Sequence, residues 1–411
     1  MSGKRSTESL RICIVAARFV IQGRATDQGF LWPIAKHLSN RGHHVTVIST
    51  KSFIGKPEVE RNGVKVYYLH DGFPNLSHMK FEKAVLQKFL ALHKETPFDI
   101  VHSMDRSAIL LGKYKKNLGC KIAYDINGTQ MTQLFSILGM SQESVGSLLQ
   151  TGLALVYKFL TTYFLGGDRD LLKNADGVFV GSPQQKIFLE RYYLYPEFKT
   201  YTVPYGIELG DLSIKESDHQ MRTRFQIPEG AHLVITFSDL TDAKETTVIL
   251  KAFEKVAIKK PNAYLCIVGN GPAWKDVEFE LLSLALGSKA IMTGALKGEE
   301  ISELIADCDV LIDLGAKSSG LDPVMVEAMA QKKIIIGSEM SPTSDLIADG
   351  KDGFLIRPAD SDYLSQLLLN IFSGVIPSSE VGERARAKVL GLFDTKKMVD
   401  SIETAYRNML K

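Results

Sequence analysis

A stretch near the carboxyl end of the sequence combines residue types that could hold a phosphate. A loop of small residues at 315–322 separates an apolar run at 310–314 from a helical pattern that begins at Pro323. Backbone N–H groups beside a helix N-terminus suit a phosphate, so the amides of residues 320–322 are candidate contacts. Glu327 lies one turn into the helix, where its carboxylate could accept a hydrogen bond from a hydroxyl beside that phosphate. We therefore expect this loop and helix to bind a phosphate-bearing ligand.

The elements around this loop make it part of a βαβ unit. A β-rich run, Ile334-Ile335-Ile336, directly follows the helix, so strand, loop, helix and strand occur in that order. The loop therefore leaves the carboxyl end of a strand, where open α/β sheets bind their ligands. The rest of the second half repeats this alternation. Its strands are expected at 233–240, 263–272 and 289–296, and its helices at 245–259, from Asp276 and at 299–306.

The first half of the chain shows the same alternation of strands and helices. Asp105 ends its fourth strand, and Asn127 lies at the end of its fifth. Polar groups that gather at strand ends mark a ligand cleft. We expect strands at 11–19, 44–50, 64–70, 98–105 and 121–129, another within 174–193 and a last one from Tyr201, with helices at 31–40, 81–93 and 396–410.

Length and composition limit the class of protein. A chain of 411 residues exceeds what one hydrophobic core usually holds, which favours two domains of roughly 200 residues. The net charge of +2 gives no electrostatic reason to expect a nucleic-acid partner. The four widely spaced cysteines lack the paired spacing of zinc sites and predict buried thiols in a reducing compartment. The amino terminus leads into a strand too short for a signal-peptide core, so we expect a cytoplasmic protein.

Two short segments resemble a known family. The chain resembles retaining glycosyltransferases of family 4 in two sequence motifs, Glu327-Ala328-Met329-Ala330 and the turn Arg41-Gly42-His43. The resemblance is strong at 264–360 and weak elsewhere. It implies an α/β fold of the GT-B type, in which two Rossmann-like domains have parallel sheets facing each other across a cleft. It also implies an acceptor domain at 1–208, to which a C-terminal helix at 391–411 crosses back, and a nucleotide-sugar donor domain at 222–390.

The resemblance also implies roles for individual residues. Lys244 would hold the donor diphosphate and Glu327 the ribose. Asp322 or Ser319 would hold the transferred sugar. Asp105 and Asn127 would contact the acceptor. The other residues that would contact the donor are Gly23, Gly269, Asn270, Leu296, Gly320 and Leu321.

The implied reaction uses a nucleotide diphosphate sugar as co-substrate and needs neither a metal nor a cofactor. The sugar would pass to a hydroxyl of a glycan or lipid-linked acceptor, as in polysaccharide and lipopolysaccharide biosynthesis. The leaving phosphate would be stabilised by cations and amides and would help to deprotonate that hydroxyl.

At three positions this chain has a residue that differs from the one usual in the family. Asp239 stands where the family has an arginine that neutralises the diphosphate, and Ser319 stands where it has its first glutamate. Asn127 replaces a histidine; it forms hydrogen bonds but cannot take up a proton at neutral pH. The alternative function is therefore that of a catalytically inactive member that binds an active glycosyltransferase. A nucleotide-sugar epimerase would share the fold, but no residue favours it.

Two further segments have more than one interpretation. Residues 148–167 are long enough to span a bilayer but contain Gln150, Lys158 and several threonines. We expect a buried helix there, with a helix on a peripheral membrane surface as the alternative. Asp168-Arg169-Asp170 spells the DxD of metal-dependent glycosyltransferases, but it opens a helical segment, where aspartates commonly cap the N-terminus. We therefore expect no metal site there.

Overall fold

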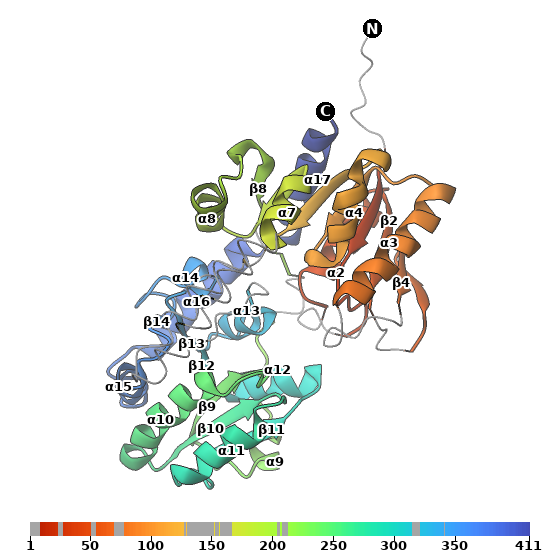
Figure 1. The fold of residues 1–411 in the computed structure, drawn as a ribbon. Coiled ribbons are helices and arrows are strands. Elements are labelled where there is room, and N and C mark those ends of the chain that lie inside the picture. The colour runs from red at the N-terminus through yellow and green to blue at the C-terminus, as the bar shows by residue number, and fades with distance from the viewer. Residues whose placement is uncertain are drawn as a thin grey trace. The chain divides into compact units, whose positions relative to one another are not determined.

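The computed structural model separates the chain into two compact units. It describes residues 9–23, 28–50, 55–69, 78–126, 129, 152, 156, 167–203, 206–207, 213–314, 321–340 and 342–411. Of these, the residues within 9–129, 167–207 and 393–411 belong to the first unit, and residues 152, 156 and those within 213–392 belong to the second. Each unit contains one sheet with helices against it (Figure 1), so the α/β class expected from the sequence is confirmed.

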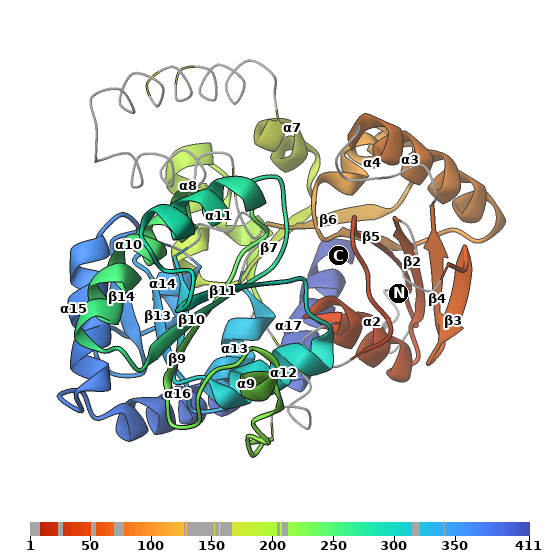
Figure 2. The ribbon, with the colours of Figure 1, turned by 90° about the horizontal axis from the view of Figure 1, so that it is seen from below.

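The first unit is built on an eight-stranded sheet with the order β3-β4-β2-β1-β5-β6-β7-β8. All neighbouring strands are parallel except β3 and β4, which pair antiparallel at the edge seen in Figure 2. The sequence analysis missed this edge strand, since charged residues fill it. The strands are β1 (Arg11–Val15), β2 (His44–Ser49), β3 (Glu58–Arg61), β4 (Val64–Tyr68), β5 (Ile100–Ser103), β6 (Lys121–Asp125), β7 (Gly177–Val180) and β8 (Thr200–Thr202).

Helices pack against both faces of this sheet, because alternate strand residues point to opposite faces. Ile12 and Ile14 of β1 join one core with the helices α2 (Leu31–Asn40) and α17 (Thr395–Leu410). Cys13 and Val15 join a second core on the other face. The helices against that second face are α3 (His78–Glu95), α4 (Ile109–Tyr114), α7 (Gly167–Asn174) and α8 (Pro183–Tyr193), with the 3₁₀ turns η1 (Arg106–Ala108), η2 (Lys115–Asn117) and η3 (Glu197–Lys199).

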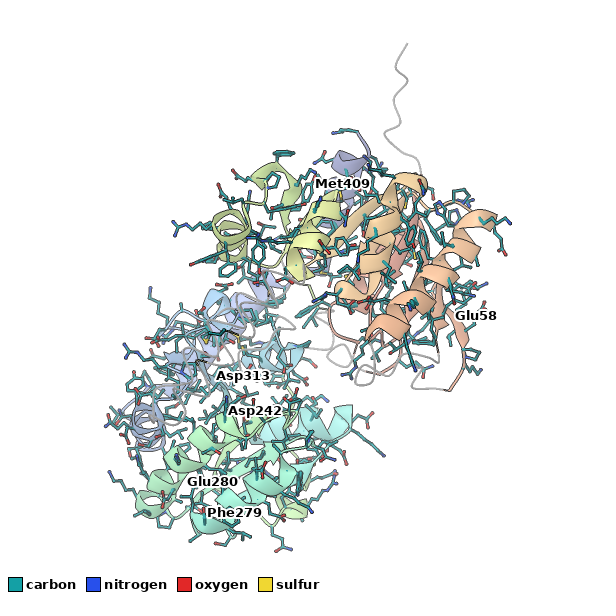
Figure 3. All side chains as sticks on the ribbon, viewed as in Figure 1. Glu58, Asp242, Phe279, Glu280, Asp313 and Met409 are labelled. Atoms are coloured by element: carbon teal, nitrogen blue, oxygen red, sulfur yellow. The ribbon has the colours of Figure 1, made fainter. Side chains whose placement is uncertain are left out.

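The C-terminal helix α17 packs within the first unit. Tyr406 is fully buried, and Met409, labelled in Figure 3, reaches Gly177 of β7, where a Cβ would lie 2.5 Å from the methionine sulfur. Arg41, which follows α2, pairs with Asp400 at 2.6 Å and with Glu403 at 2.9 Å. The end of the chain is therefore fastened by burial and by ion pairs.

The second unit has a six-stranded, fully parallel sheet with the order β11-β10-β9-β12-β13-β14. Its main core lies between this sheet and the helices α10, α11, α15 and α16. The strands are β9 (His232–Phe237), β10 (Ala263–Val268), β11 (Ala290–Gly294), β12 (Val310–Asp313), β13 (Ile334–Ser338) and β14 (Phe354–Ile356). The helices are α9 (Gln220–Arg224), α10 (Lys244–Lys259), α11 (Trp274–Ser283), α12 (Gly298–Asp307), α13 (Pro323–Ala330), α14 (Thr343–Leu346), α15 (Ser361–Phe372) and α16 (Ser378–Leu392).

Helix α13 differs from the amphipathic helix that the sequence predicts. Val326 and Met329 are buried as expected, but Val324 is partly exposed. The six residues from Met325 to Ala330 are all buried, Glu327 among them. A helix that is apolar nearly all round lies inside a unit, here between β12, β13 and the neighbouring helices α12 and α16.

The cysteines fit the expectation from the sequence. All four are free and buried. Burial raises the pKa of Cys120 to about 11 and the pKa of Cys266 and Cys308 to about 12, so these side chains remain neutral thiols.

No helix among the described residues is both long and apolar enough to cross a bilayer. Nearly all of the segment 148–167, expected as a buried helix, lies outside the described residues.

Candidate active site

The loop between β12 and α13 leads into a helix whose first turn is capped from within. Asp322 is the N-cap of α13, and its carboxylate accepts a hydrogen bond from the Val324 N–H at 2.9 Å. Pro323 follows at the first helical position, where its fixed φ and missing N–H cost nothing. Leu321 is buried beside them. Ser319 and Gly320 lie outside the described residues, so the structure places only the carboxyl end of this expected site.

Two buried carboxylates lie near the carboxyl end of β12. Asp313 is the last residue of the strand, and Glu327, only 2% exposed, lies in the second turn of α13. A small cavity of about 10 Å³, roughly the room of one water molecule, lies beside this strand end. Its lining comprises Phe237, Leu311, Ile312, Asp313, Asp322, Val324 and Met325. This part of the second unit therefore combines negative charge with low exposure to solvent.

The start of α10 is occupied by carboxylates of its own loop. Asp239 accepts hydrogen bonds from Thr241, from the N–H at 3.0 Å and from the hydroxyl at 2.7 Å. Asp242, labelled in Figure 3, accepts the Lys244 N–H at 3.0 Å. These amides begin the helix and would otherwise suit a phosphate. Lys244 itself is exposed at the first helical position, as its expected role requires.

Glu245 joins this helix to the neighbouring strand. One oxygen of its carboxylate accepts a hydrogen bond from the Leu314 N–H at 2.9 Å. Leu314 directly follows β12, so the contact fixes the point at which the loop of residues 315–320 begins. The family commonly has a glycine here, and the glutamate brings one more negative charge to the carboxyl ends of the strands.

Three loops at the carboxyl ends of β9, β10 and β11 touch through their backbones. Gly269 has φ +136°, and a Cβ at this position would overlap the Ser238 carbonyl. A Cβ on Gly271 would overlap the Asp239 carbonyl. The Gly269 N–H donates to the Gly294 carbonyl at 3.0 Å. Close packing of the loops therefore explains these glycines without a ligand.

Two neighbours of these glycines were also expected to meet a nucleotide. Asn270 is exposed and Leu296 is partly exposed. Both lie in the loops that follow β10 and β11, at the carboxyl edge of the sheet where parallel sheets bind ligands.

In the first unit, Asp105 fastens two loops together. One carboxylate oxygen accepts the Ser107 N–H at 2.7 Å and caps η1, and the other accepts the Ala17 N–H at 2.8 Å. The side chain therefore joins the loop after β5 to the loop after β1. Gly23 lies further along the loop after β1, with φ +103°, in the backbone region that favours glycine. Asn127 lies outside the described residues.

A buried polar cluster that the sequence analysis did not single out lies at the ends of β5 and β6. The ring of His102 makes a hydrogen bond of 2.7 Å with the Tyr406 hydroxyl of α17 through its Nδ1 atom. Burial lowers the pKa of His102 to about 3 and raises the pKa of Tyr406 well above its usual value, so both groups are neutral. Burial also raises the pKa of the Asp125 carboxyl group to about 7, although part of this side chain remains accessible. Only the packing of α17 over these strands reveals the cluster.

The DxD sequence adopts a helical structure. Asp168 and Asp170 lie in the first turn of α7, and Asp168 accepts a hydrogen bond from the Tyr193 hydroxyl at 2.8 Å. Among the described residues, no three metal-ligating side chains gather in a group that could hold an ion.

Comparisons with known proteins identify the family. The model for "Glycosyltransferase Family 4" matches residues 30–211, and the model for "Glycosyl transferases group 1" matches residues 217–388. The N-acetyl-alpha-D-glucosaminyl L-malate synthase of Bacillus anthracis is 24% identical over 387 residues, which cover 92% of each chain. The segment 217–388 lies within the second unit, and the described residues of the segment 30–211 lie mainly in the first.

Solved structures show the same fold. Sucrose-phosphate synthase from Thermosynechococcus elongatus superposes with a TM-score of 0.74 at 17% identity, over 97% of this chain and 99% of that chain. Anabaena Alr3699/HepE in complex with UDP-glucose superposes with a TM-score of 0.70 at 16% identity, over 97% and 99% of the two chains. The chain therefore belongs to glycosyltransferase family 4, whose enzymes transfer a sugar from a nucleotide sugar, and it has the GT-B type of fold.

Proposed function

We propose that this protein transfers a sugar, with retention, from a nucleotide diphosphate sugar to a hydroxyl of a glycan or lipid-linked acceptor. The position of Glu327 carries the proposal. Glu327 lies in the second turn of α13, the helix that follows the loop at the carboxyl end of β12. Open α/β sheets bind their ligands at this edge, and a carboxylate there could accept a hydrogen bond from a ribose hydroxyl.

The donor would be held mainly by the second unit. Lys244, at the first position of α10, would hold the diphosphate, and its side chain is exposed. Asp322 or Ser319 would hold the sugar, with the amides of Gly320 and Leu321 beside the phosphate. The loops after β10 and β11, with Gly269, Asn270 and Leu296, would meet the base. The site would use charge and positioning rather than a metal.

The acceptor would meet the first unit. Asp105 and Asn127 remain the proposed contacts, although Asp105 already accepts two backbone hydrogen bonds. A carboxylate held by two amides is fixed in position and keeps lone pairs for an acceptor hydroxyl. The cytoplasm, where nucleotide sugars are made, is the proposed location, and peripheral contact with a membrane would bring the enzyme to lipid-linked acceptors.

A specific observation favours a second candidate function, that of an inactive binding partner of another glycosyltransferase. Asp239 and Asp242 occupy amides at the start of α10, where a diphosphate would need positive groups. A carboxylate about 4 Å from a phosphate charge costs about 4 kcal/mol at an effective dielectric near 20. Lys244 at the same helix end could at best offset this repulsion.

A panel of nucleotide sugars tests the proposal. We expect one nucleotide diphosphate sugar to raise the thermal midpoint, since a ligand at 100 times its Kd adds about 2.7 kcal/mol of stability. Turnover of that donor should then be measured with glycan, lipid-linked and small hydroxy-acid acceptors. A folded protein that no nucleotide diphosphate or sugar nucleotide stabilises would contradict the proposed function.

Two substitutions separate the enzyme from the inactive partner. Lys244→Ala should nearly abolish turnover, whereas the matched Lys259→Ala, at the other end of α10, should leave it unchanged. Asp239→Arg should change turnover little in an active enzyme, because the wild-type carboxylate is bonded to Thr241 and turned into its own loop. An inactive wild type in which Asp239→Arg tightens nucleoside diphosphate binding tenfold, about 1.4 kcal/mol, would establish the partner function instead.

A further inference from the structure

The small net charge of the chain hides a large separation of charge between its units. Residues 213–392 contain 19 Lys and Arg against 26 Asp and Glu, a net charge of −7. The rest of the chain contains 30 Lys and Arg against 21 Asp and Glu, a net charge of +9, so the total is the +2 of the whole sequence. This basic remainder includes every described residue of the first unit, whereas residues 213–392 of the second unit are acidic. Charge asymmetry of this size indicates an anionic partner for the basic part.

The positive charge of the first unit is concentrated on one helical layer. Residues 78–121, which include α3, η1, α4 and η2, contain nine Lys and Arg against four Asp and Glu. Two of the acids point inward, since Asp99 accepts the Arg11 N–H at 2.8 Å and Asp105 accepts the Ala17 N–H. The exposed cations are Lys80, Lys83, Lys94, Arg106, Lys113 and Lys116. Because α3 contacts both η1 and α4, these cations share one side of the unit.

The same layer exposes large apolar side chains. Leu194 is 86% exposed and Phe198 is 78% exposed, both beside α8, while Tyr114 of α4 is 51% exposed. Smaller parts of Ile187 and Leu90 are also open to solvent, at 49% and 44%. In the described part of the first unit, Leu410 of α17 is the large exposed apolar residue outside this layer.

The exposed apolar side chains are held on a fixed framework. Lys186 of α8 pairs with Glu197 of η3 at 2.8 Å, which brings η3 alongside the helix. Ile187 and Phe198 directly follow these two charged residues in the sequence. Leu194 ends α8 in the left-handed conformation, at φ +54°, where a glycine would be easier to accommodate. An exposed leucine at this strained position fits a role for its side chain outside the unit.

We propose that this layer of α3, α4, α7 and α8, together with η1–η3, docks on an anionic lipid bilayer. Lysines near a membrane surface are attracted by acidic headgroups, and exposed leucine and phenylalanine side chains can enter the headgroup boundary. A nucleic acid would use the cations but offers little to isolated aliphatic side chains. A protein partner usually covers a contiguous apolar centre with few charges, whereas this layer also carries several exposed cations.

Co-sedimentation of the full chain with vesicles tests the proposal. We expect at least tenfold more binding to vesicles of equal parts phosphatidylglycerol and phosphatidylcholine than to pure phosphatidylcholine at low salt, with most of it lost at 0.5 M salt. The triple variant Lys83→Glu, Lys113→Glu and Lys116→Glu should lose at least tenfold. The matched control is Lys259→Glu, Lys275→Glu and Lys297→Glu, which places the same charge change on exposed lysines of the second unit and should bind as the wild type does.

A second pair of variants tests the apolar contribution. Leu194→Ser with Phe198→Ser should weaken binding severalfold. Phe279→Ser with Leu282→Ser should not, because these apolar residues, 73% and 65% exposed, lie on α11 of the acidic unit. Phe279 is labelled in Figure 3. Unchanged thermal midpoints establish that every variant is folded.

Three outcomes would overturn the proposal. Equal binding to both kinds of vesicle would remove the role of the cations. An equal loss in both lysine variants would show a response to net charge alone. Self-association without vesicles that the first triple variant abolishes, combined with failure to sediment with vesicles, would assign the layer to the acidic unit of a second copy. None of these readouts uses turnover, so the proposed function and this inference can fail separately.

Discussion

Aspartate side chains close several loops at the ends of the strands. Asp105, Asp239, Asp242 and Asp322 each accept a hydrogen bond from the backbone N–H two residues further along the chain. The short side chain of aspartate reaches this amide readily, which makes it common in turns and at helix starts. The same residue can cap a loop and face a ligand, so a local bond does not decide between the two roles. Substitution experiments at single residues can decide it.

The first prediction concerns Glu327. Glu327→Gln keeps the shape of the side chain but removes its charge, so it should weaken nucleotide binding while the thermal midpoint changes little. The lost hydrogen bond to a charged group is worth about 1.5–3 kcal/mol. Glu327→Ala should weaken binding as much and also lower the midpoint, because the position is buried. Calorimetric titration and thermal unfolding measure both effects. Unchanged binding in a destabilised Glu327→Gln protein would show that the glutamate is structural.

The second prediction concerns Asp125, whose pKa burial raises to about 7. In the unfolded chain an aspartate titrates near 3.9, so the folded protein holds this proton more tightly. The stability that the protonated group contributes is complete below about pH 4 and is lost as the pH rises to about 7. His102, Tyr406 and Tyr201 also have shifted pKa values on this side of the sheet, but they are common to the wild type and an Asp125 variant.

Asp125→Asn should remove this pH dependence. Urea unfolding at pH 5 to pH 8 should show the wild type losing stability relative to the variant as the pH rises. Curves that stay parallel across this range would show that the Asp125 carboxyl group titrates normally.

At the scale of elements, close approaches between backbones hold the strand ends in place. The loops after β9, β10 and β11 touch at Gly269 and Gly271, and Gly206 lies against the backbone of Thr395 where α17 begins. The Ile207–Asp394 bridge lies beside this last contact. Side chains at these positions would push apart the loops that carry the candidate site.

The third prediction follows from the contact at Gly269. Gly269→Ala should destabilise the second unit by several kcal/mol, since a Cβ would overlap the Ser238 carbonyl in a backbone conformation that favours glycine. The matched control is Gly287→Ala, where a Cβ would have only an ordinary contact of 3.7 Å with Leu282. Chemical denaturation of both variants measures the difference. Similar midpoints for the two would show that the loops can separate at little cost.

The fourth prediction concerns α17. Removal of residues 393–411 should unfold the first unit, because five large side chains of this helix fill its core and each contributes about 1.5–3 kcal/mol. They are Met398, Val399, Ile402, Tyr406 and Met409. Their sum is comparable to the usual stability of a domain, about 5–15 kcal/mol. Hydrogen exchange should lose protection in β1 and β5 but keep it in β9 and β12. Protection retained in β1 would show that the helix is dispensable.

At the scale of the whole molecule, the chain consists of two bodies of opposite charge, each with its own sheet. The described residues of the second unit are 152, 156 and 213–392, whereas the first unit takes its last helix from the end of the chain. We propose that this division coincides with the acceptor and donor domains.

The fifth prediction tests the independence of the second unit. A fragment of residues 213–392 should fold alone and unfold in one cooperative transition, because its main core is drawn from its own sheet and helices. It should keep any nucleotide affinity that Glu327 and Lys244 provide. Near-ultraviolet circular dichroism and calorimetry measure folding and binding. A fragment that lacks fixed tertiary structure would show that the units depend on each other.

The sequence by itself determined the order and type of most elements. Apolar alternation predicted β1, β2 and β4–β6, and the helix expected at 31–40 is α2 with the same bounds. It also predicted the family, because the residues of motifs such as Glu327-Ala328-Met329-Ala330 are adjacent in the sequence. These features depend on neighbours in the sequence, which a periodic pattern records directly.

Only the tertiary structure decided which polar groups are already satisfied and which are buried. That Asp239 turns toward Thr241, that Asp105 joins two loops and that Glu327 is enclosed all depend on residues or elements brought together by folding. The cluster of His102 and Tyr406 joins residues 304 positions apart, and its hydrogen bond exists only because α17 packs over β5. Folding also places the exposed cations and the exposed apolar residues in one helical layer. The packing of the elements decides which side chains are exposed and on which face of the sheet they lie.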